Sequence, residues 1–192
     1  MTLPRRTSLA FGMKFLNSKS AWLLANLEEG AAVLIADGTV IPVLGKEYTV
    51  RRKDGRGFPR LNPETAELTM HCKPEFVGRR VKDFLKALLC EECMRVGKTL
   101  AASLGKKITR ITASKAHSRW GSCSTGGTLS FNQLLVHAPK AILDYVIAHE
   151  VAHLKEMNHG PKFWRIVETL HPDMLQARKW LKQHGHELHR YG

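Results

Sequence analysis

The segment AILDYVIAHEVAHL, residues 141–154, decides how this chain folds and which chemistry it can support. Its clearly polar side chains are Asp144, His149, Glu150 and His153. On a helix that turns about 100° per residue, the last three share an arc of about 100° and Asp144 faces the opposite side. A helix that is apolar on nearly every side belongs in a protein interior, where unpartnered polar groups are costly. A cluster of such groups predicts a strong common partner, and a metal ion is the simplest one.

The spacing of these residues indicates zinc and hydrolysis. His149 and His153 are four positions apart, so their rings lie on one helix face and can share a cation. Imidazole suits zinc, and catalytic zinc sites keep one position open for water. Glu150 directly follows the first histidine, which places its carboxylate beside the ion. This is the H-E-x-x-H pattern, in which the glutamate is the general base for a zinc-bound water. Two hydrogen-bonded histidines in a buried helix are the alternative, but they leave the carboxylate unexplained.

A catalytic zinc ion normally has three protein ligands, and His159 is the best candidate for the third. On a continued helix it would lie about 9 Å beyond His153 along the axis. We therefore expect the helix to end near residues 155–157 and the chain to turn back through Asn158 and Gly160-Pro161. The alternative third ligand is Glu168, on a later helix.

The remaining hydrophobic patterns predict strands first and helices later, which indicates an α+β fold. The expected N-terminal elements are a helix over residues 18–29 and strands over 31–36, 39–43, 46–52 and 66–71. The expected later elements are a long helix over 76–104, strands near 107–113 and 129–136, the helix that Pro139 opens, a helix over 162–170 and a final helix. We expect residues 1–75 to form an N-terminal region with a small antiparallel sheet and residues 76–192 to form the catalytic region with edge strands. We expect the two regions to form one compact unit.

Composition limits the class of protein. At 192 residues and 43% hydrophobic, the chain can bury a sizeable core. No apolar run approaches the ~18 residues that span a membrane, and the stretch after Arg5 and Arg6 is too interrupted for a signal peptide. The cysteines lack the spacing of a secreted disulfide framework. Cys90 and Cys93 form a C-x-x-C inside the long helical pattern, which we interpret as ordinary thiols, with a second metal site or a redox role as the alternatives. These features predict a cytoplasmic protein with no membrane partner.

Several separate stretches resemble one family. They are SRWGSCS at 118–124, FNQLLVHAP at 131–139, LDYVIAHEVAHLKEMNHGPKFW at 143–164 and IPVLGKEYTV at 41–50. All are similar to the YgjP-like metallopeptidase domain, a compact bacterial zincin family that is distantly similar to SprT-like and yeast-type proteases acting on proteins crosslinked to DNA. The resemblance implies a zincin-like fold and one zinc ion held by His149, His153 and His159, with Glu150 catalytic. The family's strand-forming leader is reduced here to MTLPRRTSLAFGMKF, so we expect a shortened first sheet.

Arg119 and Trp120 lie between two expected strands, in the glycine- and serine-rich segment SRWGSCS. In zincins an edge strand beside the metal helix commonly lines the substrate cleft, where an extended peptide can pair with it. We therefore interpret Arg119 or Trp120 as bordering the active site, with Arg119 binding a substrate carboxylate or steadying an oxyanion. The alternative places Trp120 in the core and Gly121 in a tight turn.

Positive charge is concentrated in one part of the chain. There are 30 basic and 17 acidic residues, and residues 93–143 hold eight lysines or arginines with no acidic residue. Such a field attracts polyanions, so a nucleic-acid partner is one interpretation and a solvated basic surface is the other.

The predicted function is a zinc metallopeptidase acting on a peptide or protein substrate. The zinc ion would polarise the scissile carbonyl, and Glu150 would pass a proton from the metal-bound water to the leaving amine. The alternatives are a metal-dependent hydrolase of a nucleotide or other phosphoanhydride, and a nucleic-acid-associated protease or module.

Overall fold

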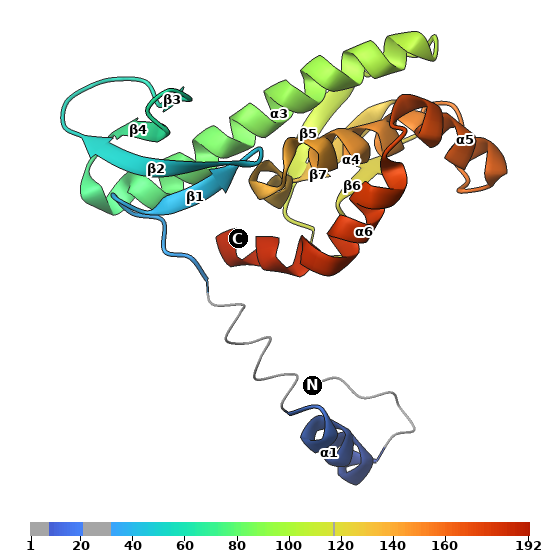
Figure 1. Cartoon of the computed structure of the whole chain (residues 1–192), viewed down its shortest axis with the longest axis horizontal. Coiled ribbons are helices and arrows are strands. Elements are labelled where there is room, and N and C mark those ends of the chain that lie inside the picture. The colour runs from blue at the N-terminus through green and yellow to red at the C-terminus, as the bar shows by residue number, and fades with distance from the viewer. Residues whose placement is uncertain (1–7, 21–31, 117) are drawn as a thin grey trace.

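The computed structural model describes residues 8–20, 32–116 and 118–192, and Figure 1 shows the arrangement of their helices and strands. The mixture of helices and small sheets confirms the α+β class. In chain order the described elements are α1 (Leu9–Ser18), β1 (Val40–Val43), β2 (Lys46–Lys53), β3 (Arg60–Asn62), β4 (Glu67–His71), η1 (Pro74–Phe76), α3 (Val77–Ser103), β5 (Arg110–Ser114), β6 (Gly121–Cys123), β7 (Thr128–Asn132), η2 (Gln133–His137), α4 (Lys140–Ala152), α5 (Pro161–Leu170), α6 (Met174–His184) and η3 (Gly185–Tyr191).

The N-terminal sheet has the strand order β1-β2-β4-β3. Strands β1 and β2 form an antiparallel hairpin, whereas β2 and β4 run parallel, with Thr49 opposite Glu67 and Lys53 opposite His71. Strand β3 pairs antiparallel with β4 at the edge. The chain thus crosses from β2 to the edge before it turns back into β4, which gives β4 the direction of β2. The sheet is therefore mixed rather than antiparallel throughout.

The first elements differ from those expected. The helix expected over residues 18–29 falls largely outside the described residues, and α1 lies before it in the chain. The strand expected over residues 31–36 does not form in the described part, residues 32–36. There the Val33 backbone N–H donates to the Arg190 carbonyl at 2.7 Å, in the C-terminal segment. This backbone donor is therefore satisfied outside a sheet, which removes the need for a strand partner.

The second sheet has the order β5-β7-β6, with β5 parallel and β6 antiparallel to β7. The strand expected over residues 129–136 ends earlier, at Asn132. Its side-chain oxygen accepts a hydrogen bond from the Leu134 backbone N–H at 3.0 Å and so begins η2. Strand β6 forms one edge of this sheet.

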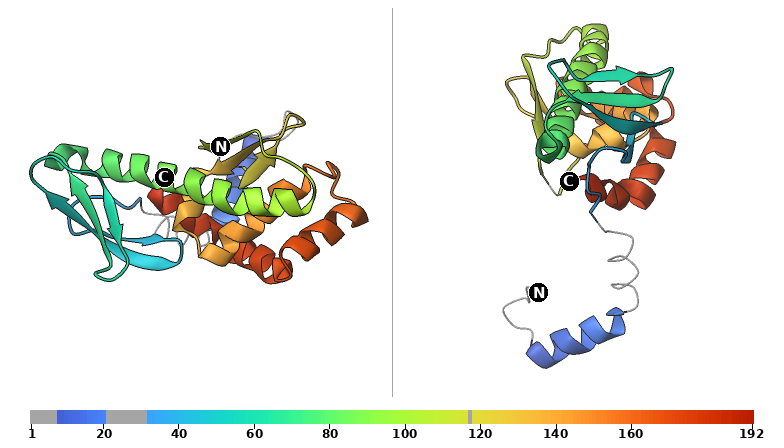
Figure 2. Two further views of the ribbon diagram at one scale, coloured as in Figure 1. Left: turned by 90° about the horizontal axis from the view of Figure 1, so that it is seen from above. Right: turned by 90° about the vertical axis from the view of Figure 1, so that its left-hand side faces the viewer.

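Helix α3 forms where the long helix was expected, over residues 76–104, and it runs beside both sheets (Figure 2). Its buried residues recur every four positions and form one stripe: Val77, Val81, Leu85, Leu89, Cys93, Gly97 and Ala101. A Cβ at Gly97 would lie 2.8 Å from Ile108 Cδ1, so glycine permits close packing there. No described helix, α3 included, is long and apolar enough to cross a membrane.

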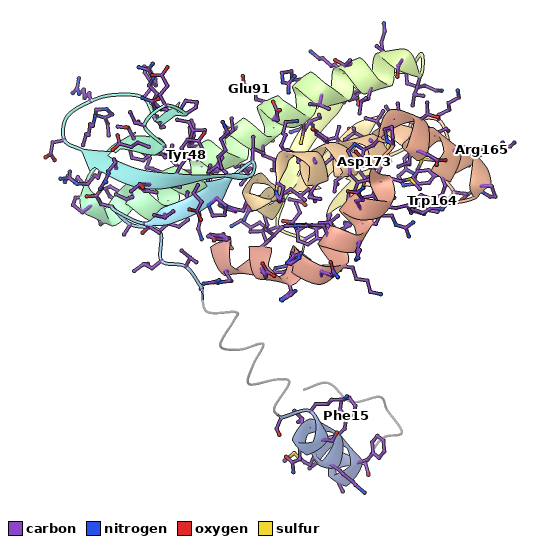
Figure 3. The ribbon with its side chains drawn as sticks, in the orientation of Figure 1. Phe15, Tyr48, Glu91, Trp164, Arg165 and Asp173 are labelled. Carbon is purple, nitrogen blue, oxygen red and sulfur yellow. The ribbon has the colours of Figure 1, made fainter. Side chains whose placement is uncertain are left out.

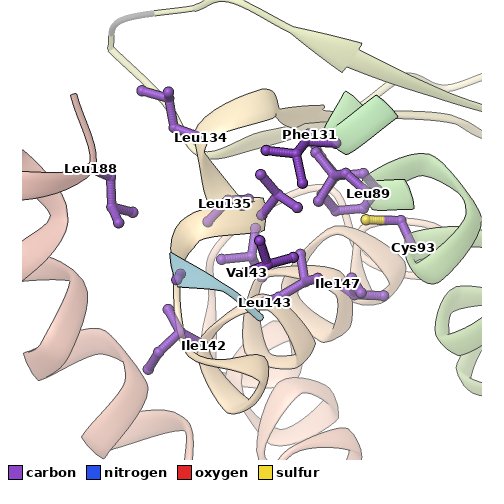
Figure 4. Packing of buried hydrophobic residues seen from close by; sticks show 14 of the residues in the cluster. Val43, Leu89, Cys93, Phe131, Leu134, Leu135, Ile142, Leu143, Ile147 and Leu188 are labelled. Carbon is purple, nitrogen blue, oxygen red and sulfur yellow. The ribbon is translucent and has the colours of Figure 1, made fainter. Parts of the chain in front are cut away.

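Helix α4 lies in the hydrophobic core, as its apolar sequence predicts. Figure 4 shows Leu143 and Ile147 of this helix meeting Leu89 and Cys93 of α3 and Phe131 of β7. Each of these side chains is less than 2% exposed. The helix that carries the H-E-x-x-H residues is thus fixed by packing on several sides.

The turn between β1 and β2 contacts the start of α4. Leu44 and Gly45 both have positive φ, and a Cβ at Gly45 would lie 3.3 Å from the Pro139 Cα. The Leu44 backbone N–H also donates to the Val136 carbonyl at 2.8 Å. The N-terminal sheet therefore packs directly against the point where α4 begins.

The C-x-x-C pair is part of α3. Cys93 is fully buried and Cys90 is half-buried, and both are free thiols. Burial raises the pKa of both thiols. Among the described residues, neither belongs to a cluster of metal-binding side chains. These observations fit the interpretation of ordinary thiols.

Candidate active site

The end of α4 brings His149, His153 and His159 together. The helix ends at Ala152 rather than near residues 155–157, because turn hydrogen bonds already replace the helical ones at this point. The chain then reverses and α5 begins at Pro161. As a result, one ring nitrogen from each of the three histidines lies within 4.8 Å of the others.

The histidine cluster fits a tetrahedral zinc ion. His159 Nε2 lies 3.1 Å from His149 Nε2. Zinc–nitrogen bonds of 2.0–2.1 Å in a tetrahedron place neighbouring ligand atoms about 3.4 Å apart. The Nδ1 atom of His153 lies 3.1 Å from the Glu156 carbonyl, so Nε2 remains available for a metal. A set of nitrogen donors at this separation matches the chemistry that zinc prefers.

All three rings pack against one buried aromatic side chain, and burial favours the neutral form of His149. Phe163, which is fully buried, has its ring centroid 4.9, 4.5 and 4.6 Å from those of His149, His153 and His159. Burial, with the neighbouring His153, His159 and Arg178, lowers the pKa of His149 to about 4. Neutral imidazole is the form that binds a metal.

Glu150 is buried beside the histidines, with 4% of its surface exposed. Burial raises the pKa of its carboxyl to about 7, and the positive charge of Arg119 opposes that rise. The carboxylate lies against Gly121 of β6, since a Cβ on that glycine would come 2.7 Å from both Cγ and Cδ of Glu150. Only a residue without a side chain leaves room for the carboxylate in this position.

Asn132 holds the loop that precedes β6. It is 2% exposed, and its Nδ2 atom donates to the carbonyl of Ala116 at 2.7 Å and to that of Arg119 at 3.4 Å. Its backbone N–H donates to the Trp120 carbonyl at 2.8 Å. A single buried side chain thus fixes the path of the SRWGSCS segment past the histidine cluster.

The two residues expected to border the cleft have different surroundings. Arg119 is exposed, and its charge acts on Glu150. Trp120 is half-buried and packs toward the C-terminal segment: a Cβ at Gly185 would lie 2.9 Å from its ring, and its ring centroid lies 5.9 Å from that of His189. Glu168, the alternative third ligand, is exposed on α5 and does not belong to the cluster.

Two neighbours of the cluster, Tyr145 and Arg178, were not identified from the sequence. The Trp164 ring lies 5.8 Å from the rings of both His149 and His159, and the Arg178 Cζ lies 4.4 Å from the centre of the Trp164 ring. Tyr145 is buried, with its ring 6.1 Å from that of His149. Burial raises the pKa of Tyr145, and Arg178 opposes the rise. Tyr145 is four positions before His149, so helical spacing alone carries a signal for it. Arg178 belongs to another helix and has no such signal.

One comparison with known proteins shows the family of this chain. A family model described as "YgjP-like, metallopeptidase domain" matches residues 1–184. Among solved structures, the crystal structure of the metallopeptidase zymogen of Methanocaldococcus jannaschii jannalysin is similar, with 24% identity and a TM-score of 0.39. That match covers 47% of this chain and 96% of the other. None of the curated proteins matches the chain.

Proposed function

We propose that this chain, which belongs to the YgjP-like metallopeptidase domain family and is a metal-dependent hydrolase, cleaves peptide bonds with a zinc ion held by His149, His153 and His159. The observation that carries the proposal is the approach of three imidazole nitrogens to within 4.8 Å of one another. Nitrogen donors favour zinc over the harder cations that prefer oxygen. A bound zinc ion would polarise the scissile carbonyl and acidify a water molecule in its open position.

Glu150 is the general base of the proposed reaction. Its carboxylate is buried next to His149 and rests against Gly121, so it is held on the side of the cluster that faces β6. There it takes a proton from the attacking water and delivers it to the nitrogen of the leaving amine. Burial keeps competing solvent away from the carboxylate while the proton is held.

The peptide substrate binds along β6 in this proposal. Strand β6 pairs with β7 on one side only in the described sheet, and it passes directly over Glu150. An extended peptide can add to such an edge through main-chain hydrogen bonds. Arg119, exposed two residues before this strand, steadies the negative charge that develops on the scissile carbonyl oxygen.

Replacing Glu150 with glutamine tests the assignment. We expect turnover of peptides to fall by about 10²- to 10⁴-fold because the base is lost, while zinc stays bound at one ion per chain. Glu91→Gln, at an exposed site on α3 (Figure 3), is the matched control and should leave both quantities unchanged.

Full turnover in the Glu150→Gln variant would reject the role of Glu150. Release of phosphate from nucleoside triphosphates by the zinc-loaded protein, without cleavage of any peptide, would instead assign the site to phosphoanhydride hydrolysis.

A further inference from the structure

Arg178 is a cation near the histidine cluster that the proposed mechanism does not use. Its Cζ lies 4.4 Å from the centre of the Trp164 ring, which itself lies 5.8 Å from the rings of His149 and His159. These separations together place the guanidinium within about 10 Å of both histidine rings. Trp164 belongs to α5 and lies next to α6 in Figure 3, so the pair belongs to the same end of the molecule as the cluster.

The guanidinium of Arg178 is available to an anion. The side chain is exposed on α6, and within the described parts of the chain it forms no ion pair with an acidic residue. A guanidinium held over an aromatic ring keeps the N–H donors at its edge free, and these donors match the two oxygens of a carboxylate. The contact with Trp164 also limits the motion of the side chain, so less entropy is lost when an anion binds.

The charge of Arg178 acts on the site itself. Its guanidinium lies over Trp164, whose ring centroid is 5.8 Å from that of His149 and 5.8 Å from that of His159. The acidic group of the site, Glu150, is buried near a different arginine, Arg119. The side of the cluster next to Trp164 therefore presents a positive charge without a matching carboxylate among the described residues.

We propose that Arg178, held over Trp164, binds a carboxylate of the peptide substrate and makes the enzyme selective for peptides with a negative charge near the scissile bond. The inference rests on the proposed peptidase function. The carboxylate can come from the free C-terminus of the peptide or from an acidic side chain, and a single set of matched peptides distinguishes these two sources.

The test uses zinc-loaded full-length protein and a mixed-sequence peptide pool made in matched forms. In the first pair of pools, the peptides end either in a free carboxylate or in an amide. In the second pair, all peptides end in an amide and carry either Glu or Gln at an internal position. Cleavage is followed by mass spectrometry. We expect Arg178→Gln to lower kcat/KM for the charged forms by about 10- to 100-fold, the range for hydrogen bonds to a charged group. The uncharged forms and the zinc content should be unaffected.

Lys179→Gln is the matched control, because it removes the same charge from the exposed neighbouring position of α6. It should keep the preference for charged peptides. A preference confined to the free-carboxylate pair identifies the C-terminus as the bound group, and one confined to the Glu/Gln pair identifies an acidic side chain. An unchanged ratio between charged and uncharged peptides in Arg178→Gln overturns the inference.

Failure of the peptidase proposal gives a different result, namely no cleavage of any peptide by the unsubstituted protein. Binding of the same peptides, followed by tryptophan fluorescence, then decides the role of Arg178. If the Arg178→Gln variant binds only the charged peptides more weakly, the carboxylate contact is supported. If its affinity falls equally for charged and uncharged peptides, or does not fall, the contact is rejected.

Discussion

Replacing Gly121 with alanine changes the closest packing contact of the Glu150 carboxylate. The added Cβ would lie 2.7 Å from both Cγ and Cδ of Glu150. Carbon atoms pack at about 3.5–4.0 Å, so the carboxylate must move by about 1 Å. A displacement of about 1 Å in a catalytic group can cost about 10²-fold in rate. We therefore expect kcat to fall by about 10²-fold.

The fold should tolerate this substitution. Gly121 does not have positive φ, so alanine fits its backbone conformation. The clash is with side-chain atoms of Glu150 and not with backbone, so the side chain can shift while the helix keeps its path. The melting temperature and the zinc content should therefore stay close to those of the unsubstituted protein, which separates an effect on Glu150 from a loss of structure.

The assay is the rate of peptide cleavage at saturating substrate, measured beside zinc content and thermal unfolding. Gly126→Ala is the matched control, because a Cβ there would meet only Ser124 Oγ at 3.9 Å in the turn that follows β6. Full activity of Gly121→Ala would refute the argument, as would an equal loss in the Gly126 variant.

Three further substitutions test the third ligand, the loop and the ion pairs on α3. His159→Ala should weaken zinc binding by at least about 100-fold in a chelator competition, and stoichiometric tight binding would place the third ligand elsewhere. Asn132→Ala removes its bonds to Ala116 and Leu134 and should lower the free energy of unfolding in urea by about 2–3 kcal/mol; a change below about 0.5 kcal/mol would contradict its role. Glu92 pairs with Arg95 at 2.6 Å and Lys140 at 3.1 Å, and Arg95 above all lowers its pKa from 4.5 to about 2. Because this pKa is lowered on folding, its stabilisation is present above pH 4.5 and is lost as the pH falls toward 2. Glu92→Gln should therefore cost about 1 kcal/mol at pH 7 and little near pH 2, and a cost independent of pH would exclude the ionic contribution.

The features that follow from local spacing were predictable from the sequence. The buried stripe of α3 repeats every four residues, and His149 and His153 share a helix face for the same reason. The reversal that brings His159 back follows from Asn158 and the Gly160-Pro161 pair, although α4 ends earlier than expected.

Features that depend on long-range packing were not predictable in this way. The parallel pairing of β2 with β4 depends on where the intervening strand is placed. The contact between Gly121 and Glu150 joins an edge strand to a helix that follows it in the chain. Arg178 reaches the site only because α6 packs near α4. No single-sequence pattern encodes these approaches, since each arises from the assembled tertiary structure.

The contact of the β1–β2 turn with Pro139 makes the N-terminal sheet a mechanical support for a distant reaction centre. His149 lies ten residues beyond Pro139, which corresponds to about 15 Å along the helix axis. Over this distance, a tilt of α4 by about 4° about its N-terminal end displaces the His149 imidazole by about 1 Å. Lengthening the β1–β2 hairpin would therefore lower the catalytic rate, although it changes none of the residues at the reaction centre.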